Sequence, residues 1–129
     1  MRIIAGKNKG KKLKSFEGDA IRPTSDRARE SLFNILAPSI LGCDFLDLCC
    51  GTGAVGIEAI SRGASLVTFV DVSRESAKIA EFNLKSISSD IKVNLSDAKK
   101  FVSQTYLKFD IIFFDPPYAF QGFEDILSI

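Results

Sequence analysis

The chain contains no histidine, and this absence removes a large part of enzyme chemistry. Without histidine there is no Ser-His-Asp triad and no imidazole general base, and most zinc sites lose a usual ligand. Cysteine is scarce: Cys43, Cys49 and Cys50 are an odd number, two of them adjacent, which is a poor basis for disulfides or for zinc. We therefore expect reduced, buried cysteines, no bound metal and a cytoplasmic protein.

Long apolar runs are missing as well. No stretch approaches the roughly 20 residues that a membrane-spanning helix needs. The first six residues turn basic without the apolar core and cleavage site of a secretory signal, so neither a membrane partner nor secretion is expected. With 129 residues, 46% of them hydrophobic and 26% charged, the chain has the balance of one compact domain rather than of a disordered segment.

Acidic residues are absent from the first 15 residues, which hold six basic side chains. Residues 1–31 contain nine Lys and Arg against four Asp and Glu, whereas the remainder contains eight against twelve. Such segregation favours contact with a polyanion, although a solvated basic tail explains the charge alone equally well. Two β-like runs, 2–5 and 11–16, flank the turn signal Asn8-Lys9-Gly10 and predict a basic hairpin.

Strand-like and helix-like segments alternate after the hairpin. Capping residues before Asp26 and apolar residues at helical spacing predict a helix from about 25 to 37, stopped by Pro38. The predicted strands are then 45–49, 66–70, 91–95 and 109–114, and the predicted helices are 53–62, 75–87 and 97–106. Strongly apolar strands separated by helices are typical of a parallel sheet covered on both faces, so we expect an α/β fold.

The segment between the first predicted strand and its helix is rich in glycine. Gly51, Gly53 and Gly56 match G-x-G-x-x-G, in which glycines let the backbone turn tightly and approach a ligand. Asp71 ends the next strand, 20 residues after Gly51, where a carboxylate can accept hydrogen bonds from both hydroxyls of a ribose. This combination predicts a nucleoside-bearing cofactor at the loop.

The charge of Asp47 distinguishes between two candidate cofactors. NAD carries a pyrophosphate that binds a helix N-terminus, and a carboxylate at Asp47 would repel it. S-adenosylmethionine instead carries an ammonium and a sulfonium, which a carboxylate attracts. Asp97 follows the third strand, where it could accept a hydrogen bond from an adenine amino group, cap the next helix, or do both. The predicted cofactor-binding residues are Asp47, Leu48, Cys49, Gly51, Gly53, Asp71, Val72, Asp97 and Ala98.

The tetrapeptide Asp115-Pro116-Pro117-Tyr118 follows the fourth predicted strand directly. The carboxyl ends of parallel strands form the ligand crevice, and the first and fourth strands flank the point where the strand order reverses. A stiff turn would explain the prolines, but neither the aspartate at the strand end nor the aromatic residue beyond the turn. We therefore predict these four residues to be catalytic.

The tetrapeptide suits transfer of a methyl group to an exocyclic amino group of guanine or adenine. Such a nitrogen is a weak nucleophile, because its lone pair is delocalised into the ring. The Asp115 carboxylate and the Pro116 carbonyl could accept its two hydrogens and aim the lone pair at a sulfonium methyl group. Tyr118 could stack on a flipped-out base. This chemistry fits guanine N2 and adenine N6 equally well.

With these residues the chain resembles the bacterial 16S ribosomal RNA (guanine-N2)-methyltransferases. The resemblance covers nearly the whole chain, and its more specific parts are Arg2-Ile3-Ile4-Ala5-Gly6 and Arg22-Pro23-Thr24. Other matching blocks are Asp26-Arg27, Leu32-Phe33-Asn34, residues 45–48, 56–59 and 61–64, Asp71, Asn83-Leu84, Phe109-Asp110 and the tetrapeptide.

The resemblance implies a Rossmann-like methyltransferase fold, S-adenosylmethionine as cofactor, and guanine N2 in 16S ribosomal RNA of the small ribosomal subunit as target. It also implies that the basic hairpin contacts RNA phosphates. We expect an RNA-binding extension over residues 1–24 and a methyltransferase domain over residues 25–129. The RNA-binding residues expected are Arg2, Lys7, Lys9, Lys11, Lys12, Arg22 and Thr24.

The family's sheet normally continues beyond the fourth strand, whereas this sequence ends at Ile129, soon after the tetrapeptide. We expect a truncated sheet in the order 3-2-1-4, whose fourth strand is an uncovered apolar edge through which copies of the chain associate. Three alternatives stay open at this point: an N6-adenine methyltransferase of RNA or DNA, a non-catalytic RNA-binding remnant, and an NAD-binding oxidoreductase.

Overall fold

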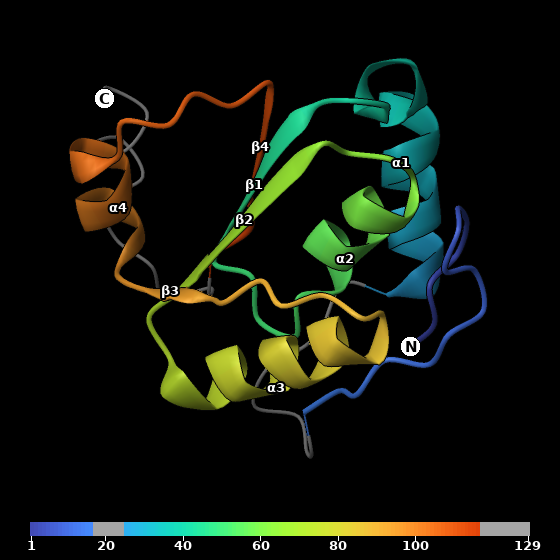
Figure 1. Ribbon diagram of the computed structural model, residues 1–129, viewed down its shortest axis with the longest axis horizontal. Helices are drawn as coiled ribbons and strands as arrows, with labels where there is room; N and C mark the ends of the chain where they lie inside the picture. The colour runs from blue at the N-terminus through green and yellow to red at the C-terminus, as the bar shows by residue number, and fades with distance from the viewer. Residues whose placement is uncertain (17–24, 117–129) are drawn as a thin grey trace.

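The computed structural model describes residues 1–16 and 25–116, in which four parallel strands form one sheet in the order β3-β2-β1-β4 (Figure 1). The strands are β1 (Asp44–Leu48), β2 (Leu66–Asp71), β3 (Asn94–Leu95) and β4 (Ile111–Phe114). The helices are α1 (Asp26–Ile40), α2 (Ala54–Ser61), α3 (Arg74–Ser86) and α4 (Ala98–Gln104). The predicted parallel α/β fold and strand order are confirmed.

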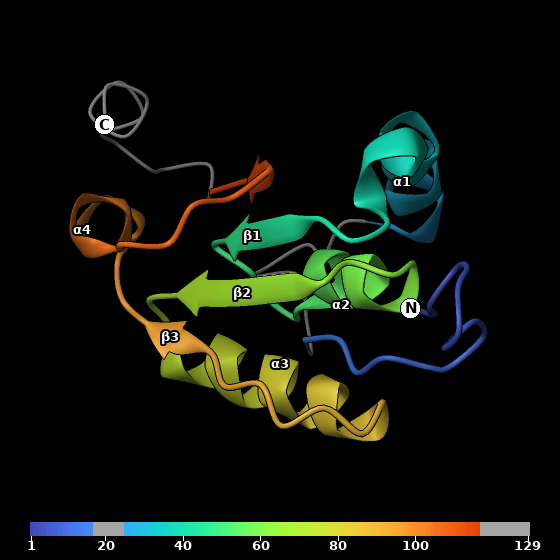
Figure 2. The ribbon, with the colours of Figure 1, turned by 45° about the horizontal axis from the view of Figure 1, so that its top comes forward.

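Helices cover both faces of the sheet, with α1, α2 and α3 on one side and α4 on the other (Figures 1 and 2). Phe45 of β1 and Phe69 of β2 belong to the larger core beneath α1, α2 and α3. Leu46, Leu48 and Val70 form the smaller core with α4. Because successive strand residues point to opposite faces and both faces are covered, β1 and β2 carry apolar side chains on both faces and are buried along most of their length. None of the helices described here is both long and apolar enough to cross a membrane.

The largest differences from the predicted boundaries are at the end of α1 and the start of β3. Helix α1 continues through Pro38 to Ile40. Pro38 removes the helical hydrogen bond to the carbonyl of Asn34, but Ile40 beyond it is 2% exposed in the core, and its burial favours the additional residues of the helix. Strand β3 has two residues instead of five. The N–H of Val93 donates to Glu81 Oε2 at 2.8 Å rather than to a strand, so pairing with β2 begins only at Asn94.

Strand β4 lies at one edge of the sheet formed by the described residues, as predicted. It pairs with β1 in the register from Phe45–Ile111 to Leu48–Phe114. Ile112 is 55% exposed there. Association of two copies through this edge stays a prediction.

The N-terminal residues form the predicted hairpin, although only one β-bridge, Arg2–Lys12, is regular. The N–H of Ile3 donates to the carbonyl of Lys11 at 2.9 Å, and the N–H of Leu13 donates to that of Met1 at 2.9 Å. Ile3 and Leu13 are 1% and 6% exposed and belong to the larger core. The apolar side of the hairpin is therefore packed against the rest of the fold.

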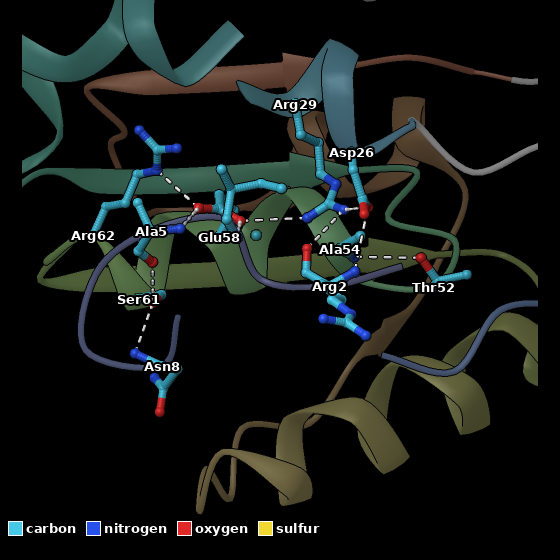
Figure 3. Close-up of polar contacts among 12 residues, drawn as sticks. Arg2, Ala5, Asn8, Asp26, Arg29, Thr52, Ala54, Glu58, Ser61 and Arg62 are labelled. Carbon is cyan, nitrogen blue, oxygen red and sulfur yellow. Dashed lines mark hydrogen bonds and ion pairs between the residues drawn. The ribbon is translucent and has the colours of Figure 1, made fainter. Parts of the chain in front are cut away.

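Glu58 of α2 attaches this hairpin to the helices (Figure 3). Its carboxylate is fully buried. Oε1 accepts from the N–H of Ile4 at 2.9 Å and from Arg29 Nη1 at 3.3 Å, and Oε2 accepts from the N–H of Ala5 at 3.1 Å and from Arg62 Nε at 2.8 Å. Two cations and two backbone amides thus satisfy one buried charge, as a stable buried carboxylate requires.

Neighbouring contacts extend the attachment to residues 2–8 of the hairpin (Figure 3). The fully buried Arg29 donates to the carbonyl of Arg2 at 3.0 Å and also to the carboxylate of Asp26. The hydroxyl of Ser61 donates to the carbonyl of Ala5 at 2.6 Å and accepts from the N–H of Asn8 at 3.0 Å. The hairpin is held through its backbone and its apolar side chains, which leaves its basic side chains facing solvent.

We predict that Glu58→Ala lowers the free energy of unfolding by about 3–5 kcal/mol, because it removes the buried carboxylate partner of Arg29 and leaves it only the partly exposed carboxylate of Asp26. Chemical denaturation measures this change. The matched control is Glu30→Ala, which removes an exposed carboxylate from α1 and should change stability by no more than about 0.5 kcal/mol. Equal effects of the two substitutions would contradict a central role of Glu58.

Candidate active site

Carboxylates gather at the edge of the sheet where the parallel strands end. Asp47 lies near the end of β1, Asp71 ends β2, and Asp115 directly follows β4. Leu48 at the end of β1 pairs with the penultimate residue of β2 on one side and with the last residue of β4 on the other. Asp71 and Asp115 therefore lie on either side of the loop that leaves β1, at the point where the strand order reverses.

The loop between β1 and α2 turns sharply. The backbone φ angles of Cys49, Gly51 and Gly53 are 69°, 55° and 82°, in the left-handed region that favours glycine and strains Cys49. Among the described residues, only the ring of Phe16 comes within 4 Å of a Cβ placed at Gly51, at 3.9 Å. The loop backbone is accordingly accessible to a ligand at Gly51.

Gly56, the third glycine of the motif, has a packing role. A Cβ there would lie 2.3 Å from the ring of Phe69, so only glycine lets α2 approach the sheet this closely. The same approach brings the N–H of Gly56 to 2.9 Å from Asp47 Oδ2. The carboxylate of Asp47 thus occupies the first turn of α2.

Asp47 is 1% exposed, and burial raises its pKa to about 7. Desolvation of the charged form is the main cause; the hydrogen bond from Gly56 opposes it, and the charges of Asp71 and Asp115 add to the rise. Within residues 1–16 and 25–116, every ion pair lies in the Arg29, Glu58 and Arg62 network. The three aspartates therefore lack a cationic partner there, which favours a cationic ligand.

Asp71 and Asp97 both accept hydrogen bonds from backbone amides. Asp71 accepts from the N–H of Gly51 at 2.8 Å through Oδ2 and from that of Ser73 at 2.9 Å through Oδ1. A carboxylate has about four acceptor positions, so Asp71 retains capacity for ribose hydroxyls. Asp97 Oδ1 accepts from the N–H of Lys100 at 2.7 Å and caps α4, which confirms one of its two predicted roles. Its contact with adenine stays a prediction.

The other predicted cofactor-binding residues differ in exposure. Leu48 and Ala98 are 1% and 4% exposed, so only their backbone groups could meet a ligand, whereas Val72 is 73% exposed. Burial raises the pKa of the half-buried Cys49 to about 12 and that of the buried Cys50 above its usual range. Both thiols stay protonated near neutral pH and are not nucleophiles.

Only some of the predicted catalytic and RNA-binding residues lie within the described part of the chain. Asp115 is exposed and Pro116 half-buried, while Pro117, Tyr118, Arg22 and Thr24 lie outside the described residues. The side chains of the hairpin cations are exposed, namely Arg2, Lys7, Lys9, Lys11 and Lys12. Lys11 Nζ donates to the carbonyl of Ser86 at 2.9 Å, so this side chain also caps the end of α3.

Sequence reasoning assigned no role to Glu58, Arg29 or Asn83. Asn83 is 1% exposed; its Nδ2 donates to the carbonyls of Thr52 and Lys14, each at 2.9 Å, and its Oδ1 accepts from the N–H of Lys14 at 2.7 Å. It therefore joins the glycine loop to the segment that leaves the hairpin. The available signal was a polar residue on the otherwise apolar face of a predicted helix.

Comparisons with known proteins agree with this architecture. The family described as Conserved hypothetical protein 95 matches residues 1–129. Ribosomal RNA small subunit methyltransferase D of Escherichia coli K12 is 36% identical over 130 residues, which cover 100% of this chain and 66% of that protein. The chain therefore spans about two thirds of the length of this curated relative.

Solved structures show the same fold. The Escherichia coli protein yhhF is 37% identical, with a TM-score of 0.88 over 99% of this chain and 70% of that chain. SMU.776, solved in complex with SAH, is 24% identical, with a TM-score of 0.65 over 81% of this chain and 30% of that chain, a likeness that concerns the fold alone. The fold is that of the Rossmann-like S-adenosylmethionine-dependent methyltransferases.

We predict that Asp47→Asn stabilises the ligand-free protein increasingly as pH rises from about 4 to 7. Folding raises the pKa of Asp47 from 3.8 to about 7. Between these two values the carboxyl is ionised in the unfolded chain but protonated in the folded one, so the wild type loses stability as pH rises. The loss stops above the folded pKa, and the asparagine of the variant does not titrate. Denaturation at pH 5 and 7.5 should show the advantage of the variant growing by roughly 2–4 kcal/mol. An advantage that is independent of pH would contradict the raised pKa.

Proposed function

This chain belongs to the family described as Conserved hypothetical protein 95, and from that premise we propose that it is an S-adenosylmethionine-dependent methyltransferase of ribosomal RNA. The observation that carries the proposal is the group of three aspartates around the glycine loop, which have no cationic partner among the described residues. The proposed target is the exocyclic N2 amino group of a guanine in 16S ribosomal RNA. The Escherichia coli relative is named for methylation of small-subunit ribosomal RNA.

The site favours S-adenosylmethionine over NAD on electrostatic grounds. The carboxylate of Asp47 accepts a hydrogen bond from the N–H of Gly56 in the first turn of α2. A pyrophosphate would otherwise bind at this end of the helix. Asp47, Asp71 and Asp115 together favour a ligand with an ammonium and a sulfonium over one with two phosphates. In this proposal Asp71 at the end of β2 accepts hydrogen bonds from the ribose hydroxyls, and Asp97 after β3 accepts one from the adenine amino group.

Bound S-adenosylmethionine supplies a methyl group that is electrophilic because it is attached to a positively charged sulfur. The chain positions the nucleophile: the Asp115 carboxylate and the Pro116 carbonyl accept hydrogen bonds from the two hydrogens of the base amine. Pro116 and Pro117 restrict the backbone at this point, so little reorganisation is needed during transfer. Tyr118 stacks on the flipped-out base. The proton lost by the amine after transfer passes to Asp115 or to solvent.

The hairpin presents cations to the RNA. Residues 1–24 act in this proposal as an RNA-binding extension, and residues 25–129 as the methyltransferase domain, in a cytoplasmic protein that meets the small ribosomal subunit. The exposed basic residues contact phosphates, and Arg22 and Thr24 complete the RNA-binding set, whose other members are Arg2, Lys7, Lys9, Lys11 and Lys12. The backbone of the hairpin is hydrogen-bonded to Glu58 and Ser61, so the basic side chains of the hairpin project from a backbone that is fixed in place.

We predict that the chain binds S-adenosylhomocysteine but not NADH, as measured by calorimetric titration. Asp71→Asn should weaken S-adenosylhomocysteine binding by about tenfold or more, because the ribose loses a charged acceptor. Asp90→Asn, which changes an exposed aspartate after α3, should leave the affinity unaltered. Tight binding of NADH would reverse the assignment of the cofactor.

We predict that Asp115→Ala reduces transfer of a radiolabelled methyl group to unmodified small ribosomal subunits by roughly 100-fold or more, because one acceptor for the amine is lost. The affinity for S-adenosylhomocysteine should change much less. Digestion of the labelled RNA should yield N2-methylguanosine, whereas N6-methyladenosine would redirect the proposal to adenine. Absence of transfer by a wild-type chain that binds S-adenosylhomocysteine would favour a non-catalytic RNA-binding role.

A further inference from the structure

Phe82 on α3 is an exposed aromatic ring among lysines. Its side chain is 61% exposed. Lys14 Nζ, from the segment that leaves the hairpin, lies 5.5 Å from the centroid of the ring. Lys78 and Lys85 lie one turn before and one turn after Phe82 on the same face of α3, and both are exposed. One cation therefore lies over the exposed ring, and two more exposed lysines are its neighbours along the helix.

The position of the Lys14 backbone is determined by two partly buried hydrogen bonds. Asn83, next to Phe82 on α3, binds both backbone groups of Lys14, accepting from its N–H at 2.7 Å and donating to its carbonyl at 2.9 Å. Residues 11–16 run beside α3 in both views (Figures 1 and 2). Lys11 Nζ is bound to the carbonyl of Ser86 at the end of α3. The backbone of Lys14 is therefore held beside α3, next to Phe82.

Acidic groups on α3 do not cancel this charge. Glu81 accepts a hydrogen bond from the N–H of Val93 at 2.8 Å, so its carboxylate points toward the segment that precedes β3. Glu75 lies in the first turn of α3, two turns away from Phe82. Asp90 is exposed in the connection after the helix. The immediate surroundings of the ring carry positive charge that is continuous with the hairpin through Lys11.

The same segment leads to the glycine loop. Besides holding Lys14, Asn83 donates to the carbonyl of Thr52 at 2.9 Å. Two residues after Lys14, the ring of Phe16 lies 3.9 Å from the Cβ position of Gly51. The surface around Phe82 is accordingly connected by a short, hydrogen-bonded stretch of chain to the proposed cofactor site.

We propose that Phe82, Lys14, Lys78 and Lys85 form a platform on which an unpaired base of the substrate RNA stacks, while the lysines contact the adjoining phosphates. An aromatic face stacks on any base, and clustered lysines neutralise a polyphosphate backbone. A protein partner fits less well, because lysine is depleted from the cores of protein interfaces. The inference rests on the proposed RNA substrate and adds a site on α3 to the one on the hairpin.

Fluorescence anisotropy with a fluorescein-labelled single-stranded RNA tests the platform. Phe82→Ala should weaken RNA binding by about 5-fold to 100-fold, and Phe82→Tyr, which keeps a ring, should bind like the wild type. Lys14→Ala should weaken binding and reduce its dependence on salt. The matched control is Tyr106→Ala, which removes a fully exposed aromatic ring between α4 and β4 and should leave RNA affinity unaltered.

Calorimetric titration of the same variants with S-adenosylhomocysteine separates this inference from the proposed function. Phe82→Ala with unchanged affinity for both S-adenosylhomocysteine and RNA would overturn the platform alone. An effect on RNA binding that is equal for Phe82→Ala and Tyr106→Ala would overturn it as well. A wild-type chain that binds RNA but not S-adenosylhomocysteine would count against the proposed cofactor and leave the platform standing.

Discussion

The structure depends on one buried carboxylate. Glu58 lies in the interior with its two oxygens shared among two arginines and the amides of Ile4 and Ala5. Each partner belongs to a different part of the chain: α1 supplies Arg29, the end of α2 supplies Arg62, and the hairpin supplies the amides. A buried charge tolerates no missing partner, so the hairpin, α1 and α2 must come together in one arrangement.

Asp47 is the opposite case within the same fold. Burial is as complete as for Glu58, but its polar contact among the described groups is the N–H of Gly56, and its neighbours Asp71 and Asp115 carry the same sign of charge. Glu58 is compensated and organises the fold, whereas Asp47 has no cationic partner within residues 1–16 and 25–116 and lies beside an accessible loop. Uncompensated burial of this kind is typical of functional sites, because a ligand can supply the missing partner.

The parts of the fold that the sequence predicted are those where one local signal dominates. Apolar runs separated by amphipathic helices specify the parallel sheet, and the aspartates at the strand ends follow from it. The shortened β3 could not be foreseen, because the N–H of Val93 is bound by a side chain from α3. Arg29 and Glu58 were missed for a related reason: charged side chains are almost never fully buried, and their pairing joins residues 29 positions apart. At the candidate site, the glycine loop and the carboxylates were recognisable, whereas the role of Asn83 depends on two segments that only the folded chain brings to it.

The side-chain amide of Asn83 makes three hydrogen bonds to two segments that are distant in the sequence, and it is almost completely buried. The stretch at Lys14 and the turn at Thr52 are therefore mechanically linked through a single rigid group rather than through the sheet. A shift of either segment must displace the other or break one of these bonds.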